Sequence, residues 1–597
     1  HNSNRNLEVT TLLANYTKLF KILQSFENKE RVRRKMNVQD KTEKKRMKMQ
    51  DVEILNLPDE ILLCIFEYVN ISSRKNVSQV CWKFYELICI VERDCHPLEI
   101  SNQQICDAGI RSSIVKSYRK FEHLKIDINY IAVDNIEYIL DVMGKFGERL
   151  KRFKLWSSNP DQDSEFTTEG LIKILDCLPN VEDLTLTNIH FQSDLNVNHD
   201  KSEFNMHKLK KLEINVCSFM FPNILHKIPK NTLRDLIFLP FEFDVSSFQK
   251  FFNQQTNIRK LEVFEFQDIN FNHLELEHLK IFLTFELPAV LRQQPKLRYL
   301  ELNENDMDNE IFTVMCDLKN LEVAKMSHGQ VSCNIFNSLK KMSNLKELQL
   351  WTNRDDDECH HLLEFSMMHS LQIEKLTLLC PERKISEDIL IQLSQHFRKL
   401  KHIEFLSSRI VNINLIKTIL EYFPNLELIV FEFYFHPPED ILIISEDLRH
   451  ENLKQLEVTN NKTFNVENTR TLLKLISVCP NLERIIISKL TGIVHEDLQQ
   501  ILDDHPKLTH LSLEFDRFTF QHETIELIHS AGSRLKDIRF GGLRKCPSDS
   551  ALKILFEDEF PNISSRKNLE NGMTKFIMKK RNISEWYSDF DFTGFYG

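Results

Sequence analysis

The run Glu358-Cys359-His360-His361 is the densest collection of metal-ligating side chains in the chain, and it directly follows Asp355-Asp356-Asp357. Thiolate, imidazole and carboxylate groups are the ligands that zinc binds in proteins. A closed metal site needs its ligands held in a fixed geometry, and adjacent histidines in a charged loop do not meet that need. We therefore expect no metal site and no cofactor.

The sequence also lacks the short motifs of common catalytic sites. It contains no G-x-x-x-x-G-K-[ST], G-x-G-x-x-G or H-E-x-x-H motif, and it has only 12 glycines in 597 residues. Cys81 lies on an apolar face with no histidine near it in the sequence, so we interpret it as a core residue. We expect no catalytic residues and no enzyme; a triad assembled from distant residues is the alternative that the sequence leaves open.

Residues 57–88 have the pattern of two amphipathic helices. Leu57-Pro58 places proline in the first turn, where its missing N–H costs nothing, and two acidic residues follow at the positive end of the helix dipole. Apolar residues then recur at spacings of three and four. They are Ile61, Leu62, Ile65, Phe66 and Val69, and then Val77, Val80, Cys81, Phe84, Leu87 and Ile88. A unit this small rarely buries a sufficient core alone, so we expect a neighbour or a partner to cover it.

From about residue 120 the chain repeats the phrase L-x-x-L-x-L after a helical pattern. A degenerate copy lies near Leu124, and clear copies begin at Leu150, Val181, Leu209, Leu233, Ile258, Leu297, Leu321, Leu345, Ile373, Leu400, Leu426, Leu453, Leu482, Leu508 and Leu535. The long interval from Ile258 to Leu297 holds either a weak copy near Leu276 or an inserted loop. Such a period indicates a solenoid, because no single coil can bury its apolar face alone. We expect an α/β solenoid of about 16 repeats, with parallel strands on the concave side and helices on the convex side.

Polar positions in each copy suggest two roles. Asn or Cys stands eight residues after the first Leu at Cys217, Asn305, Asn353 and Asn461, where it would satisfy backbone groups as the strand ends. Residues two, four and six places after the first Leu should face the concave side. Aromatic residues at those places are Trp156, Phe264, Tyr299 and Trp351. Because exposed aromatic residues often dominate interfaces, we predict that these four bind a target; packing against loops or the aromatic tail is the alternative.

The charge of the chain and the length of its apolar runs argue against a nucleic-acid or membrane partner. The net charge is −10, and residues 28–50 alone carry ten Lys/Arg and three Asp/Glu, so the remaining chain is distinctly acidic. No apolar run reaches the roughly 18 residues of a membrane span.

Thirteen scattered cysteines without a C-x-x-C pair indicate a reducing compartment, cytoplasmic or nuclear. Arg33-Arg34-Lys35 and Lys44-Lys45-Arg46 belong either to a charged leader or to a nuclear import signal.

The segments LPDEILLCIFEYV and VCWKFYELI together resemble the F-box, and the whole chain resembles the F-box and leucine-rich-repeat proteins. The similarity departs in one place: many F-boxes have V-C-K-x-W, whereas here Trp82 directly follows Cys81. The resemblance implies docking to the Skp adaptor of a cullin-RING (SCF) ubiquitin ligase. Carried over to this sequence, the resemblance implies a docking surface that includes Leu57, Pro58, Ile61, Leu62, Ile65, Phe66, Val80, Trp82 and Phe84. For any single one of them, the alternative is that it only fills the small core of its own unit.

The expected organisation has five parts. They are a disordered basic leader (1–51), the F-box (52–95), a connector (96–119), the leucine-rich-repeat solenoid (120–540) and a C-terminal cap and tail (541–597). The resemblance implies a non-catalytic substrate receptor of the ligase, which binds a target protein on its concave face. A non-degradative scaffold built from the same parts is the alternative.

Overall fold

The structure is a computed structural model, and the chain divides into two compact units, His1–Leu62 and Leu63–Gly597. The structure describes residues 57–69, 74, 77–95, 97–117, 119–129, 136–157, 165–192, 203–215, 218–219, 222–239, 242–265, 270–271, 273–283, 287–303, 309–327, 341–351, 372–379, 387–411, 414–435, 447–460, 463–519, 522–531, 534–545, 562–567 and 574–579. The basic leader, the Glu358–His361 run and the aromatic residues after 580 lie outside this part of the chain.

The predicted pair of helices is present as α2 (Asp59–Tyr68) and α4 (Trp82–Cys95). The predicted connector carries regular structure as well: β1 (Leu98–Ile100), α5 (Asn102–Cys106) and α6 (Ala108–Lys116). Strand β1 pairs in parallel with β2 (His123–Asp127), so the sheet begins before the first recognisable repeat.

In the part of the chain that the structure describes, a 20-stranded sheet runs through the repeats, and its strands pair in parallel except the last two in sequence. After β2 the parallel strands follow one another in chain order. They are β3 (Arg152–Trp156), β5 (Asp183–Thr187), β7 (Lys211–Asn215), β9 (Asp235–Leu239), β11 (Lys260–Glu265), β12 (His278–Leu283), β13 (Tyr299–Asn303), β14 (Val323–Ser327), β15 (Glu347–Trp351), β16 (Lys375–Leu379), β17 (His402–Val411), β18 (Leu428–Phe435), β19 (Gln455–Asn460), β20 (Arg484–Leu490), β21 (His510–Thr519) and β22 (Asp537–Lys545). Strand β24 (Thr574–Lys579) then pairs antiparallel with both β22 and β23 (Asn562–Lys567).

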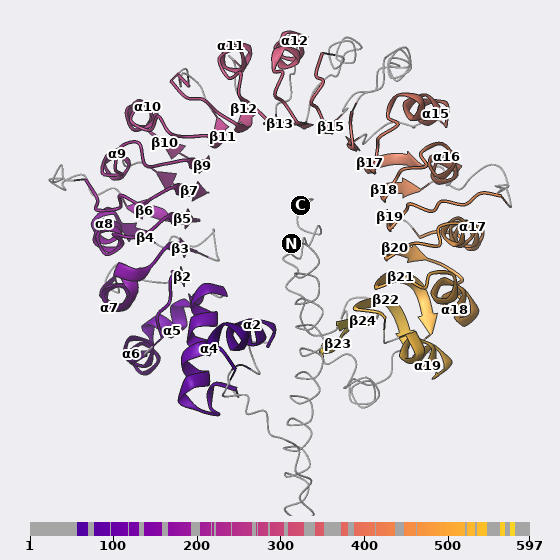
Figure 1. The fold of residues 1–597 in the computed structure, drawn as a ribbon, viewed down its shortest axis with the longest axis horizontal. Helices are drawn as coiled ribbons and strands as arrows, with labels where there is room; N and C mark the ends of the chain where they lie inside the picture. The colour runs from indigo at the N-terminus through magenta and orange to yellow at the C-terminus, as the bar shows by residue number, and fades with distance from the viewer. Residues whose placement is uncertain are drawn as a thin grey trace, which may run out of the picture. The chain divides into compact units, whose positions relative to one another are not determined.

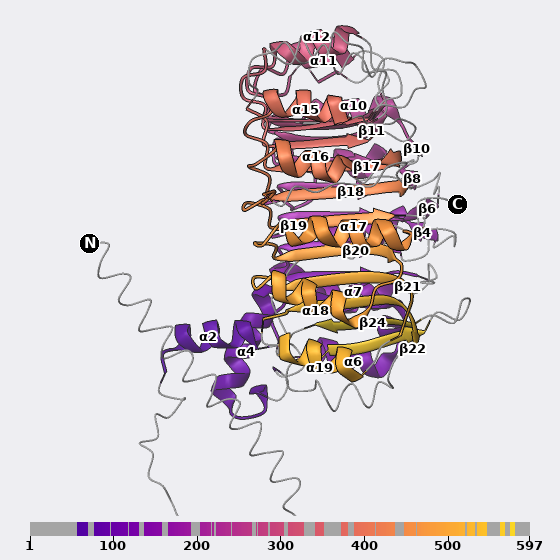
Figure 2. The same ribbon diagram turned by 90° about the vertical axis from the view of Figure 1, so that its right-hand side faces the viewer.

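Short helices connect these strands on the convex side of the array, as Figure 1 shows. They are α7 (Ile136–Phe146), η3 (Gly147–Arg149), α8 (Thr168–Asp176), α9 (Pro222–His226), α10 (Val245–Phe252), α11 (Leu287–Arg292), α12 (Asn309–Asp317), α15 (Glu387–His396), α16 (Asn414–Tyr422), α17 (Val466–Ser477), α18 (His495–Asp504) and α19 (His522–Ala531). Figure 2 shows helices α15 to α19 stacked in chain order. A second sheet of four short parallel strands joins β4 (Glu165–Thr167), β6 (His190–Gln192), β8 (Ser218–Phe219) and β10 (Glu242–Phe243).

The leucine spacing determines which side chains enter the core. In the coil of β17, Leu400, Ile403 and Phe405 are buried, whereas the intervening His402 and Glu404 stay half-buried on the concave side. This is the alternation expected of a strand, in which successive side chains point to opposite faces. The buried rows of successive coils join into one continuous core, which confirms the predicted α/β solenoid.

The long interval in the repeat pattern contains a complete coil. Leu276 is fully buried, and β12, which follows it, pairs in register with β11 on one side and β13 on the other. The structure therefore has a weak copy near Leu276, and an inserted loop is the wrong interpretation of this interval.

Asparagines at the amino-terminal edge of the sheet join consecutive coils. In seven described coils the residue before the first inward apolar residue is an Asn whose Nδ2 donates to a backbone carbonyl of the preceding coil, at 2.6 to 2.9 Å. These residues are Asn180, Asn257, Asn320, Asn344, Asn425, Asn452 and Asn481. The positions predicted for this task, Cys217, Asn305, Asn353 and Asn461, lie outside the described residues.

Candidate docking surfaces

Helix α2 begins as the sequence predicts. The carbonyl of Pro58 accepts hydrogen bonds from the backbone N–H groups of Ile61 and Leu62, both at 3.1 Å. Asp59 and Glu60 occupy the first turn, where carboxylates suit the positive end of the helix dipole. Pro58 is exposed, whereas Leu57 and Ile61 are half-buried.

Four of the nine predicted docking residues are buried. Leu62, Ile65, Phe66 and Phe84 have almost no solvent-accessible surface, and the rings of Phe66 and Phe84 meet edge to face with centroids 5.1 Å apart. A large apolar side chain that is already covered stabilises its own unit. All four side chains are therefore already covered in this structure, and their contact with a partner remains a prediction.

Val80 and Trp82 have the opposite environment. Their side chains are 67% and 65% exposed, and the indole of Trp82 stacks on Tyr85 with ring centroids 5.2 Å apart. Exposed apolar groups of this size in a compact unit mark interaction sites, and Trp is the residue type most often found at the energetic centre of an interface. The start of α4 thus presents the strongest candidate for adaptor contact.

Arg74, which the sequence analysis did not select, closes the carboxyl end of α2. Its Nε donates to the carbonyls of Phe66 at 3.0 Å and Val69 at 2.8 Å, and its Nη2 donates to the carbonyl of Glu67 at 2.9 Å. The last carbonyls of a helix lack intrahelical partners, so a buried guanidinium satisfies several of them at once. The only sequence signal was a basic residue shortly after the helix.

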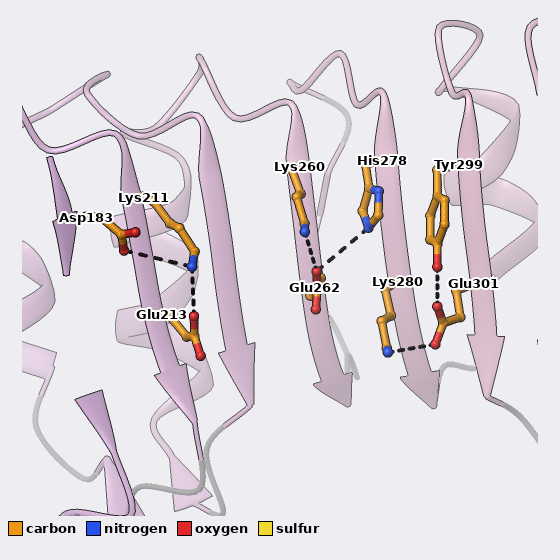
Figure 3. Close-up of polar contacts among 9 residues, drawn as sticks. All are labelled: Asp183, Lys211, Glu213, Lys260, Glu262, His278, Lys280, Tyr299 and Glu301. Atoms are coloured by element: carbon orange, nitrogen blue, oxygen red, sulfur yellow. Dashed lines mark hydrogen bonds and ion pairs between the residues drawn. The ribbon is translucent and has the colours of Figure 1, made fainter. Parts of the chain in front are cut away.

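The concave face from β5 to β13 carries a network of paired charges, shown in Figure 3. Lys211 lies between Asp183 at 3.9 Å and Glu213 at 2.9 Å. The ion pairs Lys260–Glu262 and Lys280–Glu301 both measure 2.7 Å. All of these residues stand two or four places after an inward Leu, as predicted for the concave side.

Tyr299 and His278 lie at the β12–β13 end of this stretch. Their rings stack with centroids 3.9 Å apart, and the Tyr299 hydroxyl donates to Glu301. Burial, reinforced by the hydrogen bond to Glu301, raises the pKa of Tyr299. Burial and the nearby Lys260 ammonium lower the pKa of His278 to about 4, so its imidazole is neutral at physiological pH. Tyr299 is half-buried, and its hydroxyl already has a hydrogen-bond partner in Glu301.

The other predicted aromatic residues lie apart from one another. Phe264 is 46% exposed, and the centroid of its ring lies 5.5 Å from that of Phe282 on β12, a residue that the sequence did not point to. Trp156 is half-buried on β3, where Lys154 lies 6.0 Å from its ring. Trp351 ends β15, and its side chain lies outside the described residues. Since β3 and β11 are four strand intervals apart, roughly 19 Å, the four residues do not form a single cluster.

In the described ranges, no group of three or more His, Cys, Asp or Glu side chains is arranged to hold a metal ion. None of the helices that the structure describes combines the length and apolarity of a membrane-spanning segment.

Comparison with known proteins places an F-box domain at residues 54–96. A search of curated protein sequences found no significant match. Among solved structures, the chain is similar to a leucine-rich-repeat protein of Leptospira interrogans (16% identity, 66% of this chain and 95% of that chain covered, TM-score 0.30) and to the Rad7 and Elc1 complex in yeast (12%, 76% and 88%, TM-score 0.29). It is also similar to the TLR13–ssRNA13 complex (14%, 79% and 61%, TM-score 0.30). At these identities and TM-scores the structural similarity carries no functional inference.

Proposed function

We propose that this chain is the substrate-recognition subunit of an SCF ubiquitin ligase. Its F-box binds the Skp adaptor, which joins it to the cullin, and the concave face of its repeats binds a target protein. The observation that carries the proposal is the F-box domain at residues 54–96 with Val80 and Trp82 exposed on it, followed by a solenoid whose strands display polar and aromatic side chains. The proposal includes no nucleic acid, membrane or cofactor, and it assigns the protein to the cytoplasm or the nucleus.

In this role the chain performs no chemistry of its own. It holds a target lysine near a ubiquitin-conjugating enzyme, and tethering raises the local concentration of that lysine to roughly the millimolar range or above. The rate of transfer then depends on the lifetime and geometry of the complex. This mechanism needs two separate binding surfaces and no catalytic residue in the chain.

Isothermal titration of purified Skp adaptor into the full chain tests the docking assignment. We expect the double variant Val80→Ser, Trp82→Ala to bind at least about tenfold more weakly, a loss of ~1.4 kcal/mol, because it removes the exposed apolar anchor. Tyr422→Ala is the matched control, since Tyr422 is also an exposed aromatic residue but lies on α16. A second variant, Leu57→Ala with Pro58→Ala, tests the start of α2.

If both F-box variants bind the adaptor as tightly as the wild type, the docking assignment is wrong. If the chain binds adaptor but never recruits cullin, the non-degradative scaffold replaces the ligase receptor as the function.

A further inference from the structure

The concave face changes character at β18. From β7 to β13 its side chains are largely paired charges, such as Lys211–Glu213 and Lys280–Glu301. On β18 the two corresponding positions hold Leu428 and Val430, both half-buried. Further half-buried apolar side chains are Leu406 on the adjacent strand β17 and Ile486 on β20, two strands away, where Glu457 of β19 lies between Val430 and Ile486 in the register. In this part of the concave face the apolar side chains of β18 therefore alternate with polar side chains of the adjacent strands, such as Glu404 and Glu457.

Glu432 is the third concave-side position of β18. It is half-buried and lies opposite Thr459 of β19 in the strand register. Within the described part of the chain, no hydrogen bond or ion pair reaches its carboxylate. Burial raises the pKa of the Glu432 carboxyl.

Nearby cations are already engaged by other carboxylates. Glu404 and Glu457 lie on either side of Val430 in the register. Lys375 pairs with Glu404 at 3.0 Å, and Arg484 pairs with Glu457 at 3.2 Å. Among the described side chains, the region therefore offers an external ligand one carboxylate without a counterion, Glu432, which stands two residues along β18 from the two paired carboxylates.

This combination selects a ligand by its chemistry. A carboxylate that is partly removed from water is stabilised by a cation that comes within hydrogen-bonding distance. The apolar residues around it gain from being covered by other apolar groups. An anionic or phosphorylated segment is repelled by the same carboxylates, so charge complementarity excludes it.

We propose that Leu406, Leu428, Val430, Glu432 and Ile486, here called the Glu432 surface, bind a target segment in which one Lys or Arg is flanked by apolar side chains. The cation of the segment pairs with Glu432, and its apolar neighbours cover the leucine, valine and isoleucine side chains. This inference rests on the proposed function, because it specifies the chemistry of the target.

Selection from a random dodecapeptide library displayed on phage, with the immobilised full chain as bait, tests the proposal. We expect the wild type to enrich peptides that contain one Lys or Arg between apolar residues. For a selected peptide measured by fluorescence anisotropy, Glu432→Gln should weaken binding at least tenfold. Glu432→Lys should reverse the preference, so that the same peptide with Glu in place of its basic residue binds better. Glu496→Gln, at an exposed carboxylate on helix α18 outside the concave face, is the control that should leave the affinity unchanged.

A library that yields no basic enrichment, or a selected peptide that binds Glu432→Gln as well as the wild type, overturns the proposal. Thermal melting checks the variants: Glu432→Gln should melt no lower than the wild type, because it breaks no internal contact, and a lower melting temperature contradicts the description of Glu432 as unpartnered. Adaptor affinity, measured on the same preparations, tests F-box docking separately, so the two failures are distinguishable.

Discussion

Arg74 determines how the carboxyl end of α2 is held, because one side chain bonds to three backbone carbonyls. We expect Arg74→Met to destabilise this end by about 1.5–3 kcal/mol, since buried carbonyls lose charged donors. Hydrogen exchange of the α2 amides measures the change as faster exchange near Phe66 and Val69. Arg234→Met, a substitution of an exposed arginine in the solenoid, is the control and should leave α2 unchanged. Equal protection in both variants would show that Arg74 is not a structural cap.

His278 gives the concave face a predictable pH dependence. Its pKa is about 4 in the folded chain and about 6.5 when unfolded, so the unfolded state takes up the proton first as the pH falls. Folding stability should therefore decline from about pH 6.5 to about pH 4, by roughly 1–2 kcal/mol after allowance for solvent screening. Melting temperatures of the wild type and His278→Phe, which keeps a ring against Tyr299 but does not titrate, should converge as the pH falls. The exposed His207→Phe serves as the control, and parallel curves for His278→Phe and the wild type would contradict this account.

At the scale of elements, the asparagines along the amino-terminal edge hold neighbouring coils in register. Asn452 Nδ2 donates to the Pro424 carbonyl at 2.9 Å, a bond between residues 28 positions apart. We expect Asn452→Ala and Asn452→Asp to lower the free energy of local opening by about 0.5–1.5 kcal/mol, because both remove the donor. Hydrogen exchange in β19 measures this opening. Asp503→Ala, at an exposed site on α18, should have no effect, and unchanged protection in both Asn452 variants would rule out the role.

Elements were predictable wherever apolar spacing is strict. Leu276 already suggested the coil of β12. The expectation that residues two, four and six places after the first apolar residue of each copy face the concave side placed Lys260, Glu262 and Tyr299 correctly. Spacing could not tell whether an apolar helical face is covered: for Phe66 and Phe84 it left adaptor contact and core packing as alternatives, and the structure shows both side chains buried. Nor could it identify side-chain partners, since the environment of Glu432 depends on strands β17 and β19, more than 20 residues away in the chain.

For the whole molecule, the central claim is a division of labour between the F-box and the repeats. The repeats suit target binding because each coil adds one strand to a continuous binding face. The F-box suits adaptor binding because Val80 and Trp82 are exposed apolar side chains that a partner can cover. The two functions should therefore be separable by mutation.

Quantitative mass spectrometry of the proteins that co-purify with the full chain tests this claim most directly. We predict that Val80→Ser with Trp82→Ala loses Skp adaptor and cullin but keeps its other partners. Glu432→Lys with Phe264→Ala should keep adaptor and cullin and lose partners that the wild type retains. Loss of both classes of partner from either variant, or of neither class from both, would contradict the division of labour.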